Sequence, residues 1–235
     1  MATAIKKGWR KVRLKMRVSK EKATANRVAL LEAASRLFRE RGIDGVGVAD
    51  IAKAAGLTHG ALYAHFKSKE ELAAAAFAHG FATNMAGARA WVEANKPKFS
   101  DLLTAFLSAS MRDRVETGCP MTASASEIGR HGCEISTCFT RAFREQLELI
   151  EASLDDGMPA VQKRRLALAT VAAQIGAVAV SRAIKKADHA LANEVLEAMR
   201  TTLENAYLYD DTAAPQAGRA DKKPPPHRLP DVPSR

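Results

Sequence analysis

The sequence predicts an all-helical protein, and three observations support this class. Hydrophobic residues make up 47% of the 235 residues, yet aromatic residues only 6%, and alanine is frequent. Alanine is the strongest helix former, whereas strands favour aromatic and β-branched residues. Apolar residues recur at helical spacing, as at Val28, Leu31 and Ala34, while no segment shows the alternation typical of a strand. The 47% apolar content is ample for a packed core in one or two domains.

Proline divides the chain into a body and a tail. Six of the nine prolines fall in residues 211–235 among polar residues, a composition that predicts a disordered, Pro-rich tail. The remaining three, Pro97, Pro120 and Pro159, divide the body, because proline interrupts helices.

Helix signals follow one another along the body. The first apolar face ends at the Arg41-Gly42 stop, and Ser68 with Glu71 three residues later resembles a capping box. We expect further helices at 48–55, 59–65, 69–95, 99–117, 123–133, 135–155, 160–186 and 188–209.

The formal net charge of +10 is unevenly distributed. Residues 1–22 contain nine Lys or Arg and a single Glu, so we expect a flexible, basic N-terminal arm. Such an arm suits DNA phosphates, although it could also serve only for solubility. Met16 offers an alternative start, and six of these basic residues precede it.

Two short helices that cross over a tight turn are expected in a segment that begins at Gly47 and ends at Phe66. Ala52 supplies a small residue for the crossing, and Gly56 a residue that tolerates positive φ in the turn. Thr58 is placed to cap the second helix. Three apolar residues would pack between the helices: Ile51, Leu57 and Leu62. The pattern predicts a helix-turn-helix, with an ordinary helical hairpin as the alternative.

The wider string from residue 57 to 72 resembles the TetR family of transcriptional regulators, whose motif here reads Gly-x-Leu-Tyr-x-His-Phe-x-Ser-Lys-x-x-Leu. The matching residues are Gly60, Leu62, Tyr63, His65, Phe66, Ser68, Lys69 and Leu72. The resemblance covers roughly residues 24–75. It implies a three-helix, helix-turn-helix DNA-binding domain at 23–70 and a helical effector-binding and dimerisation domain at 71–210.

Seven residues around the second helix would then meet DNA: Thr58, His59, Gly60, Ala61, Tyr63, His65 and Lys69. The resemblance implies that His59, Gly60 and Ala61 face base edges and that the last three hold phosphates. Because Gly60 and Ala61 lack polar side chains, Thr58 and His59 would be the direct polar readers, and DNA shape would add specificity. The alternative for His65 is an ordinary surface histidine.

Two helical segments, 166–184 and 191–208, are the expected dimer surface, because their alanines and Gly176 allow close packing as a four-helix bundle. Purely intramolecular packing is the alternative. A twofold homodimer predicts a roughly palindromic double-stranded operator. Segment 166–184 contains Gln174, Ser181 and Arg182 and suits a bilayer poorly. With no apolar signal peptide at the N-terminus, we expect a cytoplasmic protein that does not enter the membrane.

Cysteine spacing predicts neither a disulfide framework nor a metal site, since Cys119, Cys133 and Cys138 form no ligand pairs. The string GCPMTASASEIGR, which begins at residue 118, is similar to a segment of one TetR-like subgroup. Cys119 is therefore a candidate sensor of oxidants or electrophiles, or else a small buried hydrophobe. Apolar side chains nearby could line an effector pocket; the candidates are Trp91, Phe106 and Met121.

The expected function is that of a DNA-binding transcriptional regulator, a repressor released by a small-molecule or electrophile effector, with activation as an alternative. An enzyme is not expected, because the sequence contains no nucleophile elbow, paired-carboxylate motif, phosphate loop or metal cluster, and no cofactor is predicted. A nonspecific DNA-packaging protein that uses the basic arm is a third hypothesis.

Overall fold

The computed structural model describes the backbone of residues 2–210 and the side chains of residues 20–208. All regular structure in this part of the chain is helical, which confirms the predicted fold class. The predicted tail at 211–235 lies outside the described residues. The helices are α1 (Ala2–Arg41), α2 (Val48–Ala54), α3 (His59–Tyr63), α4 (Lys69–Asn95), α5 (Phe99–Phe106), α6 (Ala109–Asp113), α7 (Pro120–Ile128), α8 (Cys133–Glu151), α9 (Ala160–Ile184) and α10 (His189–Asp210).

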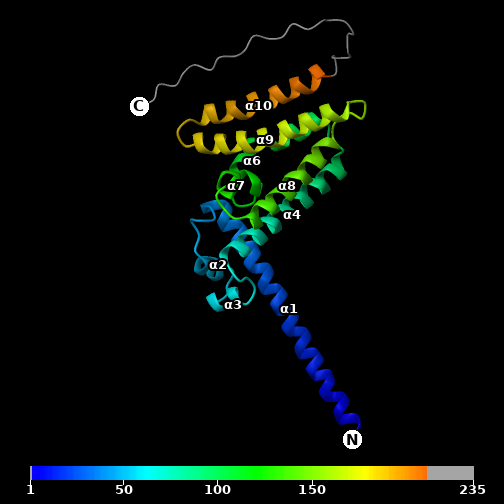
Figure 1. Ribbon diagram of the computed structural model, residues 1–235, viewed down its shortest axis with the longest axis vertical. Coiled ribbons are helices and arrows are strands. Elements are labelled where there is room, and N and C mark those ends of the chain that lie inside the picture. Colours follow the sequence, from blue (N-terminus) through cyan, green and yellow to red (C-terminus); the bar gives the residue numbers. More distant parts are fainter. Residues whose placement is uncertain (1, 211–235) are drawn as a thin grey trace.

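The helices form two packed groups that meet on α8 and on α4, where Val92 packs against the second group. Figure 1 shows α2 and α3 beside α1 at one end of the molecule, and α9 and α10 side by side at the other. The first hydrophobic cluster joins α1–α4 to α7 and α8 through residues such as Leu30, Ile51 and Met121. The second joins α5, α8, α9 and α10 around Leu103, Ile150 and other buried residues. A shift of α4 would therefore be felt in both groups.

The first helix is longer than the sequence suggests. Its backbone is helical from Ala2, so the described part of the predicted arm, residues 2–22, forms the first half of α1 and projects from the body (Figure 1). Alanine, lysine and arginine all favour helix, which accounts for the continuity. The flexibility of this segment and its contact with DNA stay predictions. At the other end α1 stops at Gly42, whose φ of 78° suits the position after a helix, as the Arg41-Gly42 signal indicates.

The helix predicted at 99–117 is wrong as a single element, because the chain divides it into α5 and α6. Leu107 leaves the helical region with φ −101° and ψ 55°. Ser108 then starts a new helix, and its hydroxyl oxygen accepts a hydrogen bond from the amide of Met111 at 3.1 Å. A serine inside a predicted helix thus acts as an N-cap, a role that competes with helix continuation.

The helix predicted at 123–133 is displaced, since α7 begins at Pro120 and ends at Ile128. Proline has no amide hydrogen, but at the first helical position none is needed, so Pro120 opens the helix. Residues 129–132 form the turn into α8, with Gly132 as its N-cap. The imidazole of His131 is held in this turn.

A tight crossing joins α1 to α4. A Cβ atom built on Gly80 would overlap the hydroxyl of Ser35 and would lie 2.6 Å from Nη1 of Arg39. Arg39 in turn donates to Ser35 Oγ at 3.0 Å and to the carbonyl of Glu116 at 2.6 Å. The absence of a side chain at residue 80 therefore lets the two helix backbones approach and keeps this arginine bonded to both domains.

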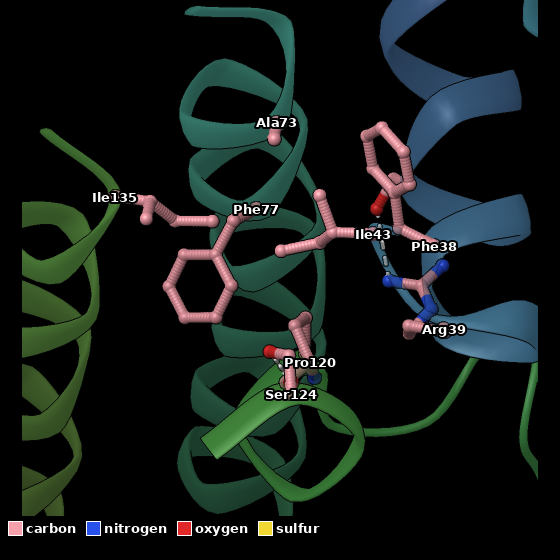
Figure 2. Close-up of a pocket in the computed structure, with 9 residues that line it drawn as sticks. Phe38, Arg39, Ile43, Ala73, Phe77, Pro120, Ser124 and Ile135 are labelled. Carbon is pink, nitrogen blue, oxygen red and sulfur yellow. Dashed lines mark hydrogen bonds between the residues drawn. The ribbon is translucent and has the colours of Figure 1, made fainter. Parts of the chain in front are cut away.

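The junction between the N-terminal helices and the rest of the chain is apolar and closely packed. Figure 2 shows Phe77 of α4 reaching between Ile135 of α8 and Ile43, with Pro120 of α7 beside it. These residues line a cavity of only about 20 Å³, which holds at most one water molecule. Motion of the DNA-binding end relative to α7 and α8 would have to repack this contact.

One helix among the described residues, α9, is long and apolar enough to cross a membrane by length and composition alone. This is weak support for a membrane span, since core and interface helices pass the same test. In α9 the exposed side chains include Leu168 and Val180 at 40% and 48% exposure.

Candidate nucleic-acid interface

The helix-turn-helix lies where the sequence predicts it. In α2, Ile51 is fully buried and Ala52 is 2% exposed, and Leu62 of α3 is fully buried against them. Leu57, in the turn, is partly buried against the same cluster. A small residue at position 52 and an apolar contact on either side of the turn thus set the crossing of α2 and α3.

Residues 55–58 make the turn with backbone hydrogen bonds and one side-chain cap. Gly56 has a φ of 68°, which a residue with a Cβ atom rarely adopts. The amide of Leu57 donates to the carbonyl of Ala52 at 2.9 Å and closes the turn. Thr58 is the N-cap of α3, and its Oγ1 accepts a hydrogen bond from the amide of Ala61 at 3.3 Å. The threonine oxygen is therefore engaged in the fold, which leaves its hydroxyl proton for a contact with DNA.

One face of α3 is open to solvent. Thr58, His59 and Gly60 are exposed, and Tyr63 is 47% exposed. The rings of His59 and Tyr63 meet edge to face with centroids 5.0 Å apart, an arrangement that orients both side chains. Nothing lies within 4 Å of a Cβ atom built on Gly60, so the backbone itself is accessible there. Thr58, His59 and Gly60, three of the residues expected to read bases, are thus exposed together.

The two remaining candidates near α3 are less exposed. Ala61 and His65 are each half-buried. The helix predicted at 59–65 ends earlier, at Tyr63, so His65 lies in the following turn, where its amide donates to the carbonyl of Leu62 at 2.9 Å.

The start of α4 holds the last candidate, Lys69. Ser68 caps the helix by accepting a hydrogen bond from the amide of Glu71 at 3.1 Å. The Glu71 carboxylate in turn accepts a hydrogen bond from the amide of Lys67 at 2.8 Å, and not from that of Ser68, so the capping box is shifted by one residue. Lys69, half-buried, follows the cap directly.

Sequence reasoning missed Arg27, on α1. Its Nη1 donates to the carbonyl of His65 at 3.1 Å, and its guanidinium carbon lies 4.3 Å from the centre of the Phe66 ring. The arginine thus holds the segment after α3 to the first helix. Residues 27 and 65 are distant in sequence, and no local pattern marks such a pair.

The sequence candidates for an effector site are only partly brought together. A cavity of about 70 Å³ in the C-terminal domain has Cys119 and Phe106 in its wall, whereas Trp91 is 39% exposed and Met121 is fully buried in the first cluster. Gln146 donates to the amide oxygen of Gln174 at 2.5 Å across the cavity wall. The remaining lining residues come from three helices, α4, α6 and α8: Phe81, Asn84, Met85, Ala88, Met111 and Leu149.

The environment of Cys119 bears on its reactivity. Burial raises the pKa of the Cys119 thiol, an effect opposed by hydrogen bonds from Thr122 and Met121 and by the charge of Arg182. The residue is 8% exposed. A raised pKa keeps the thiol protonated at neutral pH, and the thiol reacts far more slowly than the thiolate. Of the three cysteines, Cys133 is the exposed one.

Comparison with known proteins agrees with this geometry. A family model described as "Bacterial regulatory proteins, tetR family" matches residues 30–76, the segment that holds α2, α3 and the start of α4. The HTH-type transcriptional regulator TtgR of Pseudomonas putida is 47% identical over 57 residues, 24% of this chain and 27% of that protein. The chain thus matches about a quarter of the length of this curated relative. TtgR is named as a transcriptional regulator and not as an enzyme.

Solved structures extend the likeness to most of the chain. A TetR-family regulator from Cytophaga hutchinsonii superposes with a TM-score of 0.66 at 21% identity, over 78% of this chain and 96% of that one. A TetR regulator from Chloroflexus aurantiacus gives a TM-score of 0.59 at 28% identity, over 82% and 95%. The first likeness shows a shared fold, and the match at residues 30–76 shows the shared motif. Residues 30–76 thus carry the helix-turn-helix motif of the TetR family, and the helical fold of the chain is similar to that of TetR-family regulators.

Proposed function

We propose that this chain is a homodimeric transcriptional repressor that binds a roughly palindromic operator and is released from it by an effector. The observation that carries the proposal is the open face of α3, where exposed His59 and Tyr63 flank an accessible backbone at Gly60. A buried support of Ile51, Ala52 and Leu62 holds that face rigid. Rigid placement of an exposed helix is what groove recognition requires.

The division of labour on the DNA follows from the side chains. His59 and the hydroxyl proton of Thr58 can donate to base edges, and Gly60 and Ala61 allow close approach. Tyr63, His65 and Lys69 can bind phosphates, which position the protein without reading sequence. With so few polar readers, much of the specificity would come from DNA shape.

The proposed dimer uses the outer faces of α9 and α10. Leu168, Ala172, Gly176 and Val180 recur every four residues on α9 and all are exposed. On α10, Leu191 and Leu208 are 43% and 62% exposed. An apolar stripe with small residues on α9, next to exposed leucines of α10, suits a four-helix bundle between copies of the chain, and burial there would explain the hydropathy of α9.

The proposed effector site is the cavity that contains Cys119 and Phe106. At about 70 Å³ the cavity is smaller than the roughly 300 Å³ or more that encloses a drug-sized ligand. Binding would therefore spread its walls, and Phe81 and Met85 of α4 are part of them. Because the other end of α4 packs on α1, the same displacement would alter the spacing of the two recognition helices and favour release.

Fluorescence anisotropy with DNA from upstream of the chain's own gene tests DNA binding, in the presence of competitor DNA. We expect Tyr63→Ala and Lys69→Ala to lower affinity by about tenfold, or 1–2 kcal/mol, and Lys69→Ala to reduce the salt slope by about 1. Lys186→Ala, an exposed lysine next to α10, is the matched control. Unchanged affinity in both the Tyr63 and the Lys69 variant would exclude this interface. An equal loss of affinity in the Lys186 control would indicate nonspecific binding.

Light scattering tests the dimer. Leu168→Glu and Val180→Glu should yield monomers, whereas Val28→Glu, on a 40% exposed residue of α1, should remain dimeric. A dimer that survives both α9 substitutions would show that the interface lies elsewhere.

A further inference from the structure

Three side chains that can bind a metal ion meet at the junction between the two domains. Asp44 lies in the loop from α1 to α2, Glu127 in the last turn of α7 and His131 in the turn before α8. One donor atom of each lies within 4.8 Å of the other two. The Nε2 atom of His131 is 3.8 Å from Asp44 Oδ1 and 4.0 Å from Glu127 Oε1. Residues from separate parts of the chain thus converge on one point.

The histidine nitrogen at this point is buried without a hydrogen-bond partner. Nε2 of His131 is inaccessible to solvent and bonds to no described group. Its two carboxylate neighbours are too distant for a hydrogen bond, which needs about 2.7–3.2 Å. A buried polar atom without a partner is costly and rare, so the gap between the three side chains suits an atom that all three can bind.

The charge at this point also favours a cation. The side chains of Glu127 and His131 are only 12% and 17% exposed, and Asp44 adds a second carboxylate. Glu127 Oε1 accepts a hydrogen bond from the amide of Asp44 at 3.0 Å, which fixes that carboxylate and leaves its lone pairs partly free. The carboxylate of Asp44 is 75% exposed, but next to the partly buried Glu127 it still adds negative charge, and a cation between the two carboxylates would relieve their repulsion.

We propose that Asp44, Glu127 and His131 form a three-ligand site for a divalent transition-metal ion, with water completing the coordination. One imidazole nitrogen with two carboxylate oxygens suits Zn²⁺, Co²⁺, Mn²⁺ or Fe²⁺. Donors around a tetrahedral ion with bonds of about 2.0–2.1 Å lie roughly 3.3 Å apart. His131 Nε2 would therefore have to approach Asp44 and Glu127 by about 0.5 and 0.7 Å, and the two carboxylates would have to approach each other by at most about 1.5 Å. Cysteine spacing could not reveal it, because none of the ligands is a cysteine.

The site would link the domains. Asp44 follows Ile43, which lines the packed junction with Phe77 and Ile135 (Figure 2), and its loop leads into α2. Glu127 and His131 belong to the C-terminal domain. An ion bound to all three would hold the loop before the helix-turn-helix to α7 and would stabilise this arrangement of the two domains.

Titration of the untagged protein with Co²⁺, followed by its visible absorption bands, tests the proposal without DNA, so failure would not bear on the proposed function. A Cys133→Ser background removes the exposed thiol two residues from His131. We expect saturable binding of one Co²⁺ per chain, displaced by Zn²⁺, and a higher melting temperature with either metal.

Two variants and one control identify the ligands. His131→Asn and Asp44→Asn should each weaken Co²⁺ binding by about tenfold or more, and the 75% exposure of Asp44 makes the second variant compatible with folding. His189→Asn, an exposed histidine on α10, should bind as the parent does. No saturable binding in the Cys133→Ser background, or equal affinity in both ligand variants and the parent, would overturn the proposal.

Discussion

The guanidinium of Arg27 lies over the ring of Phe66, 4.3 Å from its centre, while its Nη1 donates to the carbonyl of His65 at 3.1 Å. Phe66 itself is 1% exposed and belongs to the core of the DNA-binding domain. The exposed side chain of Arg27 therefore covers the segment that follows α3 and holds the backbone of that segment to α1.

Arg27→Ala should lower the free energy of unfolding by about 2 kcal/mol, the sum of an exposed cation–π contact and one charged hydrogen bond at the lower ends of their ranges. Arg27→Lys should recover only part of the loss, because a lysine has no planar group to stack. Urea denaturation measures the free energy of unfolding of both variants. Arg36→Ala is the control on the same helix, because Arg36 is also exposed. If Arg36→Ala destabilises the protein as much as Arg27→Ala does, the loss comes from replacing an arginine on α1 and not from the contacts with Phe66 and His65.

Gly60→Ala should change stability and DNA binding in opposite directions. Nothing lies within 4 Å of the new Cβ atom, so alanine should stabilise α3 by about 0.5–1 kcal/mol. The same methyl group would stand between the α3 backbone and the DNA and should reduce affinity. Gly87→Ala, in an equally open place on α4, should stabilise without affecting DNA binding. If Gly60→Ala binds DNA as tightly as the parent, close approach at residue 60 is not needed.

Gly80→Ala should destabilise the protein by about 1–3 kcal/mol, because the added methyl group overlaps Ser35 at the α1–α4 crossing. The double variant Ser35→Ala with Gly80→Ala should regain part of this loss, since it removes the overlapping hydroxyl. Thermal denaturation of the single and double variants measures the coupling. Strictly additive effects would mean that the two residues do not interfere.

Stability should depend on Asp113 in a defined pH range. Hydrogen bonds from Arg112 and then from Lys185, both at 2.8 Å, hold the pKa of Asp113 well below its usual value of 3.8. A depressed folded-state pKa stabilises the protein above the unfolded-state pKa, and that contribution falls as the pH drops below about 4. Asp113→Asn should thus destabilise the protein at pH 7, and the difference from the parent should shrink towards pH 3. A difference that is constant with pH would contradict this origin.

Alkylation rates should rank the cysteines by exposure. Cys133 is exposed, whereas burial raises the pKa of both Cys119 and Cys138. Mass spectrometry after brief treatment with N-ethylmaleimide should find Cys133 modified first and Cys119 last. If Cys119 reacts as fast as Cys133, its thiol is open to electrophiles in solution, and Cys119→Ser should then abolish any response of DNA binding to oxidants.

Local chemistry made much of the DNA-binding domain predictable. Ala52, Gly56 and Thr58 act through their own backbone and size, so the α2–α3 crossing, the positive φ and the cap could be expected from neighbours in the chain. The same kind of signal led to errors in the C-terminal domain. Ser108 and Pro120 can each lie within, interrupt or start a helix, and only packing decides which.

The sequence by itself determined the helical class, the α2–α3 helix-turn-helix and the start of α4, because helix propensity, turns and caps depend on residues a few positions apart. Tertiary structure alone decided which distant residues meet. It brought Arg27 to Phe66, Gly80 to Ser35, and His131 to Asp44 and Glu127. Such contacts arise from the way whole helices pack, and a side chain's partners across a packed interface leave no periodic trace in the sequence.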